Sequence, residues 1–197
     1  PQIFQGAFGN NGQICIAMKR VYAHETIYDK LVDELVKLAE DAIVGNGLEQ
    51  GTQFGPLQNK MQFEKVKNYI EDGRADGTIV AGGVAPEGKG YFIRPTIVRD
   101  IDHDSPLVRE EQFGPVLPVI KYDDVDDVIN RANDSEYGLG GSVWSSDVDQ
   151  AYEVAKKVDS GTIWINKHAD LQPHVPFGGI KTSGIGTELG AEGLNEF

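Results

Sequence analysis

The chain has 197 residues, of which 40% are hydrophobic and 25% are charged. This length and composition are typical of a folded protein of one or two domains. No apolar run in the sequence reaches the ~20 residues of a membrane-spanning helix. Lys and Arg number 18 against 31 Asp and Glu, and the formal net charge of −13 argues against binding to nucleic acid or to an anionic membrane surface. The single cysteine excludes an internal disulfide framework and a zinc site built on several thiolates, and it fits a reducing compartment such as the cytoplasm.

The N-terminal part of the chain predicts a strand followed by an amphipathic helix. The strand is expected over residues 18–23. The helix should begin near Thr26-x-x-Asp29, which resembles a capping box with Asp in place of Glu. Apolar residues then repeat at helical spacing and predict one buried stripe, formed by Ile27, Leu31, Leu35, Leu38 and Ala42. The sequence Gly45-Asn46-Gly47 is expected to end the helix.

The next segment predicts a second helix and two further strands. The helix should span residues 58–73, where the apolar residues of helical spacing are Met61, Val66, Tyr69 and Ile70. A short strand should run from Thr78 to Ala81. Residues 91–98 are rich in strand formers, but Pro95 lacks a backbone N–H and therefore predicts an edge strand or a bend.

From residue 116 onward, strands alternate with helices of 10–12 residues. Strands are expected at 116–121, 140–144 and 162–165, with helices that begin at Asp123 and Asp147. This order is typical of parallel β-α-β units and predicts an α/β fold with a mostly parallel sheet flanked by helices. Ligand sites in such sheets lie beyond the carboxyl ends of the strands. The long, Gly-rich loop 166–187 follows the last strand and is therefore a candidate for function.

Cys15 is the residue whose chemistry is most suggestive. It follows the turn-forming sequence Gly9-Asn10-Asn11-Gly12, where glycine allows close approach to a ligand, and nearby amide side chains could donate to an oxyanion. The simpler interpretation is a buried, inert thiol between two isoleucines. A nucleophilic thiol would also need activation, because a free thiol with a pKa of ~8.5 is mostly protonated at neutral pH. The nearest basic residues are Lys19 and Arg20.

Two other kinds of site are not predicted. The sequence contains neither G-x-G-x-x-G nor G-x-x-x-x-G-K-[ST], so both common phosphate-binding glycine loops are missing from it. The four histidines lack the spacing of a helical metal site. His168, Asp170 and His174 share one loop, but polar residues of a loop more often face solvent than bind a metal, so no metal site is expected.

Three segments resemble signature segments of the aldehyde dehydrogenase superfamily. They are FGNNGQIC at residues 8–15, EEQFGPV at 110–116 and PFGGIKTSGIG at 176–186. Residues 90–96 and 161–166 add to the match, and the order and separation of all five segments agree with the family. The resemblance therefore covers the whole chain and implies the α/β fold of the aldehyde dehydrogenase catalytic domain.

The resemblance implies oxidation of an aldehyde to a carboxylic acid with NAD or NADP as the cofactor. In that chemistry a cysteine thiolate attacks the aldehyde to give a thiohemiacetal, hydride leaves to NAD(P)+, and the thioester that remains is hydrolysed. By position Cys15 matches the nucleophile, and its backbone N–H forms half of the oxyanion hole. Glu111 and Phe113 match the pair that holds the cofactor, and Gln62 lies near a further cofactor contact. Without the resemblance, Glu111 would be interpreted as a solvated carboxylate and Phe113 as a core residue.

Three later residues match the substrate side of the family's active site. Asn166 and Phe177 match positions that line the substrate pocket, and Glu188 matches an acidic residue that supports the active-site water or base. The alternatives from the residues themselves are a packed ring for Phe177 and a carboxylate favoured by a helix dipole for Glu188. The resemblance leaves open which aldehyde is oxidised and whether the cofactor is NAD or NADP.

The resemblance also implies that residues 1–197 are a single catalytic domain of a longer enzyme. The family's dinucleotide-binding domain, general-base glutamate and oxyanion-hole asparagine would lie upstream, and its C-terminal oligomerisation strand would follow Phe197. We therefore expect the isolated chain to show little or no dehydrogenase turnover, and the full-length enzyme to be a homo-oligomer, a dimer or a tetramer, that acts on a small-molecule aldehyde. The alternative function is a non-catalytic structural or binding protein on the same scaffold, with an inert Cys15.

Overall fold

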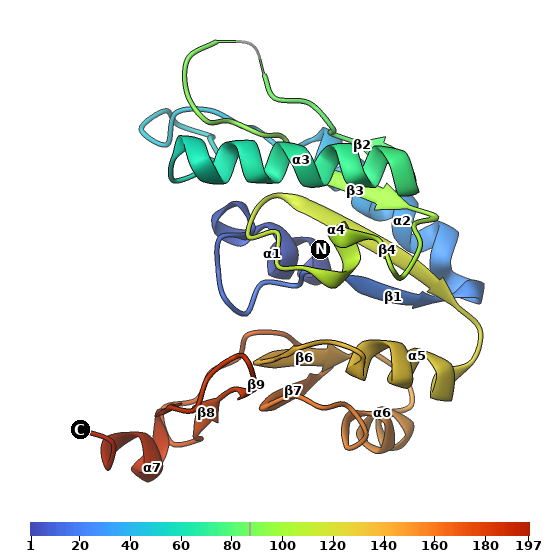
Figure 1. Ribbon diagram of the computed structural model, residues 1–197, viewed down its shortest axis with the longest axis vertical. Helices are drawn as coiled ribbons and strands as arrows, with labels where there is room; N and C mark the ends of the chain where they lie inside the picture. The colour runs from blue at the N-terminus through green and yellow to red at the C-terminus, as the bar shows by residue number, and fades with distance from the viewer. Residues whose placement is uncertain (87) are drawn as a thin grey trace. The chain divides into compact units, whose positions relative to one another are not determined.

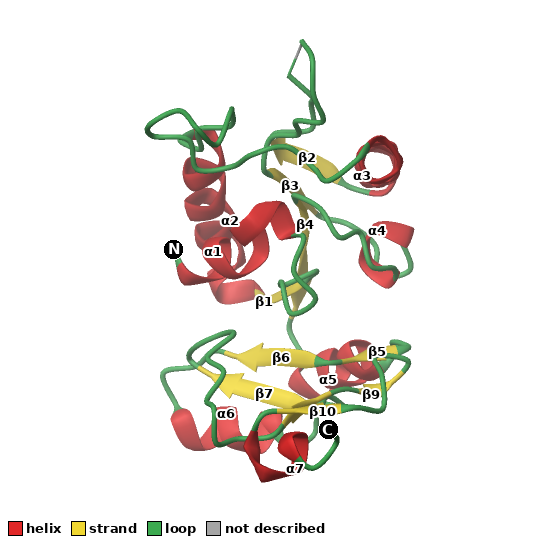
Figure 2. Cartoon of the chain, turned by 90° about the vertical axis from the view of Figure 1, so that its left-hand side faces the viewer, coloured by secondary structure: helices red, strands yellow, loops and turns green. Residues whose placement is uncertain are grey.

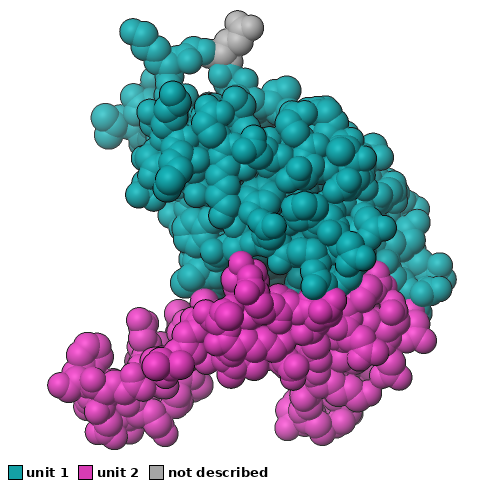
Figure 3. All heavy atoms as spheres, in the orientation of Figure 1, with its two compact units in different colours: residues 1, 3–123 teal, residues 2, 124–197 magenta. Residues whose placement is uncertain are grey.

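A computed structural model of the chain describes residues 1–86 and 88–197 (Figure 1). It divides into two compact units (Figure 3): unit 1 comprises residues 1 and 3–123, and unit 2 comprises residues 2 and 124–197. Helices and strands alternate in both units, which confirms the predicted α/β class. The expectation that residues 1–197 act as one catalytic domain stays a prediction. Within the described residues, no helix is both long and apolar enough to cross a membrane.

Unit 1 is built on a four-stranded sheet with the strand order β1-β4-β3-β2. Strand β4 (Val116–Tyr122) is parallel to β1 (Val21–His24) on one side and to β3 (Thr96–Arg99) on the other. Strand β2 (Thr78–Ala81) has the predicted bounds and pairs antiparallel with β3. The sheet is therefore mixed, with its parallel part formed by β1, β4 and β3.

Strand β3 lies inside the sheet, which overturns the expectation of an edge strand over residues 91–98. The strand begins only at Thr96, directly after Pro95. Because the proline precedes the paired residues, its missing N–H removes no hydrogen bond from the ladder. Pro95 itself lies outside the strand, and the alternative expectation of a bend at this residue stays a prediction.

Helices cover both faces of this sheet (Figure 2). One face packs against α1 (Gln2–Phe8) and α2 (Glu25–Glu40). The other face packs against α3 (Lys60–Asp76) and α4 (Pro106–Arg109). A short 3-10 helix, η1 (Gly9–Gly12), follows α1 and leads to the turn that carries Cys15.

The N-terminus and the buried face of α2 differ from the sequence prediction. The N-cap is His24, whose side chain accepts a hydrogen bond from the Thr26 backbone N–H, so Thr26 is not the cap. Ile27 is 55% exposed. The buried side chains of the helix are Tyr28, Val32, Leu35 and Ala39. Tyr28 can be buried because its hydroxyl donates to the Val119 carbonyl at 3.1 Å, which satisfies the polar end of the ring.

Unit 2 contains a parallel pair, β6 (Gly140–Val143) and β7 (Thr162–Ile165), and two helices, α5 (Val125–Asn133) and α6 (Val148–Ala155). The side chain of Asp147 accepts from the Gln150 N–H at 2.9 Å, which confirms the predicted cap of α6. The cap of α5 is Asp124, one residue after the predicted start.

The long loop that follows β7 contains short paired segments. Strand β8 (Phe177–Gly178) pairs antiparallel with β10 (Thr187–Glu188), and β9 (Ile180–Lys181) pairs antiparallel with β5 (Tyr137–Gly138). A short helix, α7 (Gly190–Leu194), comes last. Residues 166–187, predicted as a loop, are thus partly ordered by backbone pairing.

Candidate active site

Cys15 lies on the turn between η1 and β1, and its thiol is exposed. The burial assumed in the alternative interpretation is therefore wrong, whereas the reactivity of the thiol stays a prediction. Three successive residues with left-handed backbone angles precede this turn: Asn10 (φ 49°), Asn11 (φ 57°) and Gly12 (φ 69°). Asparagine and glycine are the residues that adopt this conformation at least cost. The sequence therefore favours the sharp turn that presents the thiol.

The amide side chains around Cys15 hold this turn in place. The Asn11 side chain is buried, and its Nδ2 donates to the carbonyls of Gly55 at 2.6 Å and Pro56 at 3.3 Å. The Gln13 Oε1 accepts from the Gln58 N–H at 2.9 Å. The side chains of Asn11 and Gln13 therefore stabilise the turn. This role could not be predicted from the sequence, because their hydrogen-bond partners lie more than 40 positions away.

The segment that carries Glu111 and Phe113 is anchored by glutamine side chains. Gln112 is 1% exposed, and its Nε2 donates to the carbonyls of Lys19 at 2.7 Å and Val116 at 3.0 Å. Gln62 extends from the first turn of α3, and its Nε2 donates to the Gln112 carbonyl at 2.9 Å and the Phe113 carbonyl at 3.0 Å. The structure thus places Gln62 directly against the segment that carries the other two predicted cofactor residues.

Lys19 links the turn of Cys15 to this second segment. Its Nζ donates to the Gly12 carbonyl at 2.7 Å and the Ile14 carbonyl at 3.2 Å. The same ammonium lies 4.6 Å from the centre of the Phe113 ring. From the sequence, Lys19 is only a basic residue near Cys15, because nothing local indicates a contact with Phe113.

Burial dominates the electrostatics of Lys19. Desolvation lowers the pKa of the Lys19 ammonium from 10.5 to about 8, while the charges of Glu111 and Cys15 act in the opposite direction and the charge of Lys65 adds to the lowering. An ammonium group that loses water contacts is destabilised unless neighbouring acceptors replace them. Glu111 and Cys15 therefore lie close enough to Lys19 to share its electrostatic environment.

Glu111 and Phe113 are both partly exposed. Phe113 has a left-handed backbone angle, with φ 48°, that turns the chain sharply between Gln112 and Gly114. The Lys65 Nζ donates to the backbone carbonyl of Glu111 at 3.0 Å. None of the described residues donates a hydrogen bond to the Glu111 carboxylate, so its oxygens keep their acceptor capacity for a ligand.

The three predicted substrate-side residues belong to unit 2. Phe177 and Glu188 lie opposite each other in the β8–β10 pair, and Glu188 is exposed. The Phe177 ring stacks against Trp164, with ring centres 6.5 Å apart and an interplanar angle of 28°. Asn166 follows β7 with φ 55°, and its side chain exchanges two hydrogen bonds with the Ser145 backbone, at 2.9 Å and 2.8 Å. The structure thus brings Phe177 and Glu188 together and places Asn166 at the end of a strand.

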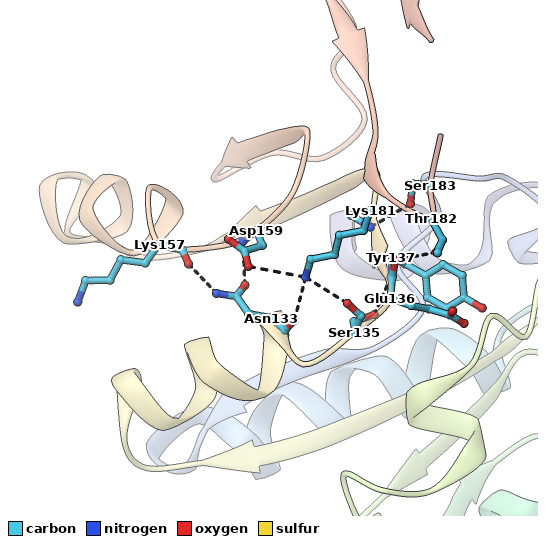
Figure 4. Close-up of polar contacts among 10 residues, drawn as sticks. Asn133, Ser135, Glu136, Tyr137, Lys157, Asp159, Lys181, Thr182 and Ser183 are labelled. Atoms are coloured by element: carbon cyan, nitrogen blue, oxygen red, sulfur yellow. Dashed lines mark hydrogen bonds and ion pairs between the residues drawn. The ribbon is translucent and has the colours of Figure 1, made fainter. Parts of the chain in front are cut away.

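Lys181 anchors the loop that carries Phe177 and Glu188 (Figure 4). Its Nζ donates to the carbonyls of Asn133 at 2.9 Å and Ser135 at 3.1 Å, just where α5 ends. It also lies 3.7 Å from the Asp159 carboxylate. The adjacent residues reinforce this attachment through side-chain bonds to the 136–138 segment, in which Thr182 donates to the Glu136 carbonyl and Ser183 accepts from the Gly138 N–H.

The candidate site in unit 1 combines an exposed thiol, a partly exposed carboxylate and an aromatic ring on an α/β fold. The sequence profile described as the Aldehyde dehydrogenase family matches residues 1–197. The chain therefore belongs to the aldehyde dehydrogenase family. Among residues 1–86 and 88–197, we find no group of three or more His, Cys, Asp or Glu side chains that could hold a metal ion.

Individual relatives agree with this assignment. The chain is 47% identical over 184 residues to the mitochondrial aldehyde dehydrogenase of Leishmania tarentolae, with 93% of this chain and 37% of that protein covered. It is 40% identical over 193 residues to the phenylacetaldehyde dehydrogenase of Pseudomonas fluorescens, with 96% and 38% covered. The NAD+ complex of an aldehyde dehydrogenase from Bacillus cereus matches the fold with a TM-score of 0.95 and 44% identity, over 100% of this chain and 40% of that chain. The chain thus spans 37–40% of the length of these relatives.

Proposed function

We propose that this chain supplies the nucleophile and part of the cofactor site of an NAD(P)+-dependent aldehyde dehydrogenase. The observation that carries the proposal is the arrangement in unit 1. The exposed thiol of Cys15 lies on a turn tied through Lys19 to the segment of Glu111 and Phe113. An exposed thiol near a positively charged group is typical of a reactive cysteine, whereas an inert structural cysteine is usually buried.

In the proposed reaction the Cys15 thiolate forms a carbon–sulfur bond with the aldehyde carbonyl carbon, and the carbonyl oxygen becomes an oxyanion. The backbone N–H of Cys15 would donate one hydrogen bond to this oxygen. Loss of the aldehyde hydrogen as hydride leaves a thioester on the sulfur. Attack by water then breaks the carbon–sulfur bond, releases the carboxylic acid and regenerates the thiol. Cys15 is the attacking group in the first step and the leaving group in the last, and its sulfur stays bonded to the substrate carbon in between.

The cofactor would be held by Glu111 and Phe113, and NAD(P)+ supplies the hydride acceptor when it is bound. Glu111 fits this role because its partly exposed carboxylate keeps its acceptor capacity and can accept from ribose hydroxyls. Phe113 fits because its partly exposed ring can border a planar nicotinamide. Gln62 acts here through the backbone of residues 112 and 113, which its amide holds at 2.9 Å and 3.0 Å.

The substrate side would be formed by Phe177, Asn166 and Glu188. The Phe177 ring presents an apolar surface for an aldehyde tail and is supported from behind by Trp164. Glu188 lies opposite Phe177 in the β8–β10 pair and is exposed, so it could orient or deprotonate a water molecule. Asn166 holds the Ser145 backbone with both ends of its amide, so it would support the substrate side by fixing the chain there.

Steady-state kinetics of the complete gene product that contains this chain test the proposal. The wild type should form NADH or NADPH from an aldehyde, and Cys15→Ser should lower kcat by about 10³-fold or more because the hydroxyl is a much weaker nucleophile at neutral pH. Lys67→Met serves as the control, since Lys67 forms an exposed ion pair with Glu64. Turnover that persists in Cys15→Ser would favour the non-catalytic interpretation of this thiol.

A further inference from the structure

We propose that Lys19 is a positioning residue for Cys15, whose ammonium group fastens the turn that carries the thiol to the ring of Phe113. This inference rests on the proposed function, because it assigns Lys19 a part in preparing the nucleophile. Three independent features of the structure support it: the contacts of the ammonium, the close approach of the two segments and the charges around the site.

The ammonium of Lys19 contacts both segments at once. Its hydrogen bonds to the carbonyls of Gly12 and Ile14, at 2.7 Å and 3.2 Å, span the residues immediately before Cys15. The 4.6 Å distance to the Phe113 ring centre is within the range of a cation–π contact. A single charged group therefore contacts both the chain that leads into Cys15 and the ring of the predicted nicotinamide neighbour.

The backbone reinforces this link from the other side. The buried Gln112 side chain donates to the Lys19 carbonyl at 2.7 Å, so Lys19 is tied to the 110–114 segment by its main chain as well. A Cβ atom on Gly12 would lie 2.5 Å from the Gly114 carbonyl oxygen, which shows how closely the two backbones approach. The turn of Cys15 and the 110–114 segment are thus already in contact in the chain without a ligand. The Lys19 side chain between them would therefore lose little conformational freedom when a ligand binds.

The charges that face the Lys19 ammonium help to set the pH range in which it is charged and can fasten the turn. They are the Cys15 thiol on its own segment, the Glu111 carboxylate on the 110–114 segment and Lys65 on α3. A charged ammonium binds carbonyl oxygens and the face of an aromatic ring more strongly than a neutral amine does, so it fastens the turn best in its charged form. Burial keeps the pKa of Lys19 near 8, so the ammonium form is present at neutral pH and is lost as the pH rises through about 8. The fold tolerates this desolvated charge, although a methionine of similar length would fit without the cost.

The rate at which iodoacetamide alkylates Cys15 tests the inference on the 197-residue chain itself. Cys15 is the only cysteine, so mass spectrometry reports one site. In this reaction the thiolate sulfur forms a bond to carbon and iodide leaves. We compare the wild type with Lys19→Met, which removes the charge and the donors, and with Lys19→Arg, which keeps both. Lys67→Met removes a surface charge from the same unit as a control.

We expect Lys19→Met to react about tenfold more slowly than the wild type near neutral pH, because the turn loses the contacts that hold it at Gly12, Ile14 and Phe113, and Lys19→Arg to stay within about twofold of it. The ratio of the wild-type rate to the Lys19→Met rate should approach one as the pH rises through about 8, where Lys19 loses its charge. A purely structural role would give a ratio that does not change with pH. Equal rates for the wild type and a folded Lys19→Met would overturn the inference. If Lys19→Met does not fold, a Lys19→Arg rate as slow as that of a thiol in a short peptide would overturn it.

Failure of this inference is distinguishable from failure of the proposed function. If Cys15→Ser abolishes turnover of the complete gene product while Lys19→Met leaves the alkylation rate unchanged, Cys15 is the nucleophile and Lys19 does not position it. If Cys15→Ser retains turnover, the proposed function fails whatever the alkylation rates are.

Discussion

Replacement of Lys181 by methionine should loosen the loop that carries Phe177 and Glu188 and destabilise unit 2. The ammonium donates two hydrogen bonds to the carbonyls of Asn133 and Ser135 where α5 ends. Methionine has a similar length but no donor, so both carbonyls would lose this partner. A cation at this end of a helix also complements the helix dipole, and this contribution would disappear as well.

The expected loss is about 2–3 kcal/mol in the free energy of unfolding. A hydrogen bond from a charged group contributes about 1.5–3 kcal/mol when it is buried, and the 27% exposure of the Lys181 side chain reduces each one because water can replace it. The ion pair with Asp159 is 3.7 Å long and its carboxylate side is 59% exposed. A pair of this kind adds at most a few tenths of a kcal/mol.

Urea unfolding monitored by tryptophan fluorescence measures this loss in unit 2 alone, because Trp144 and Trp164 are the only tryptophans and both lie in unit 2. Lys157→Met is the matched control, since the Lys157 side chain forms a surface ion pair with Asp126 in which both side chains are more than half exposed, and the substitution leaves the Lys157 backbone in place. It should cost about 0.5 kcal/mol or less. Equal losses for the two variants would refute the argument that Lys181 anchors the loop.

Two further predictions concern unit 1. Gly12→Ala should lower the stability of unit 1 by at least about 2 kcal/mol, because the residue has φ 69° and the new Cβ would lie 2.5 Å from the Gly114 carbonyl oxygen. Hydrogen exchange of the amides of β4 measures this loss. Gly47→Ala is the control and should be close to neutral, because no atom lies within 4 Å of its new Cβ. Stability should also rise between pH 8 and 10.5, because the Lys19 pKa falls from 10.5 in the unfolded chain to about 8 in the fold and the unfolded chain then binds more protons. The gain relative to Lys19→Met is about 3 kcal/mol over this interval, and parallel pH profiles of the two proteins would contradict it.

Much of the fold could be predicted because local signals and tertiary packing agree. The bounds of β2 and β7 and the Asp147 cap follow from short apolar runs and from a capping aspartate, which act within a few residues. The buried face of α2 could not be predicted from hydrophobicity alone. Ile27 is more apolar than Tyr28, yet Tyr28 is buried because a carbonyl of β4 accepts its hydroxyl hydrogen. That partner lies 91 positions away in the sequence.

The candidate site shows the same division. The residue types of Cys15, Glu111 and Phe113 could be selected from the sequence because their segments resemble a known family. The connection between those segments could not, because it runs through Lys19 and Gln112, whose partners are distant in the sequence. Local sequence signals describe which turns can form, whereas contacts between turns depend on the sheet that brings them together.

Acid quenching during turnover tests the central claim most directly. The complete gene product is mixed with an aldehyde and NAD(P)+ and is quenched with acid within the first turnovers. The protein is then digested, and the mass of the peptide that contains Cys15 is measured by mass spectrometry. Our account predicts a mass increase on Cys15 that equals the acyl group of the aldehyde, since the thioester persists in acid. Continued formation of reduced cofactor with an unmodified Cys15, or with the acyl group on another residue, would contradict it.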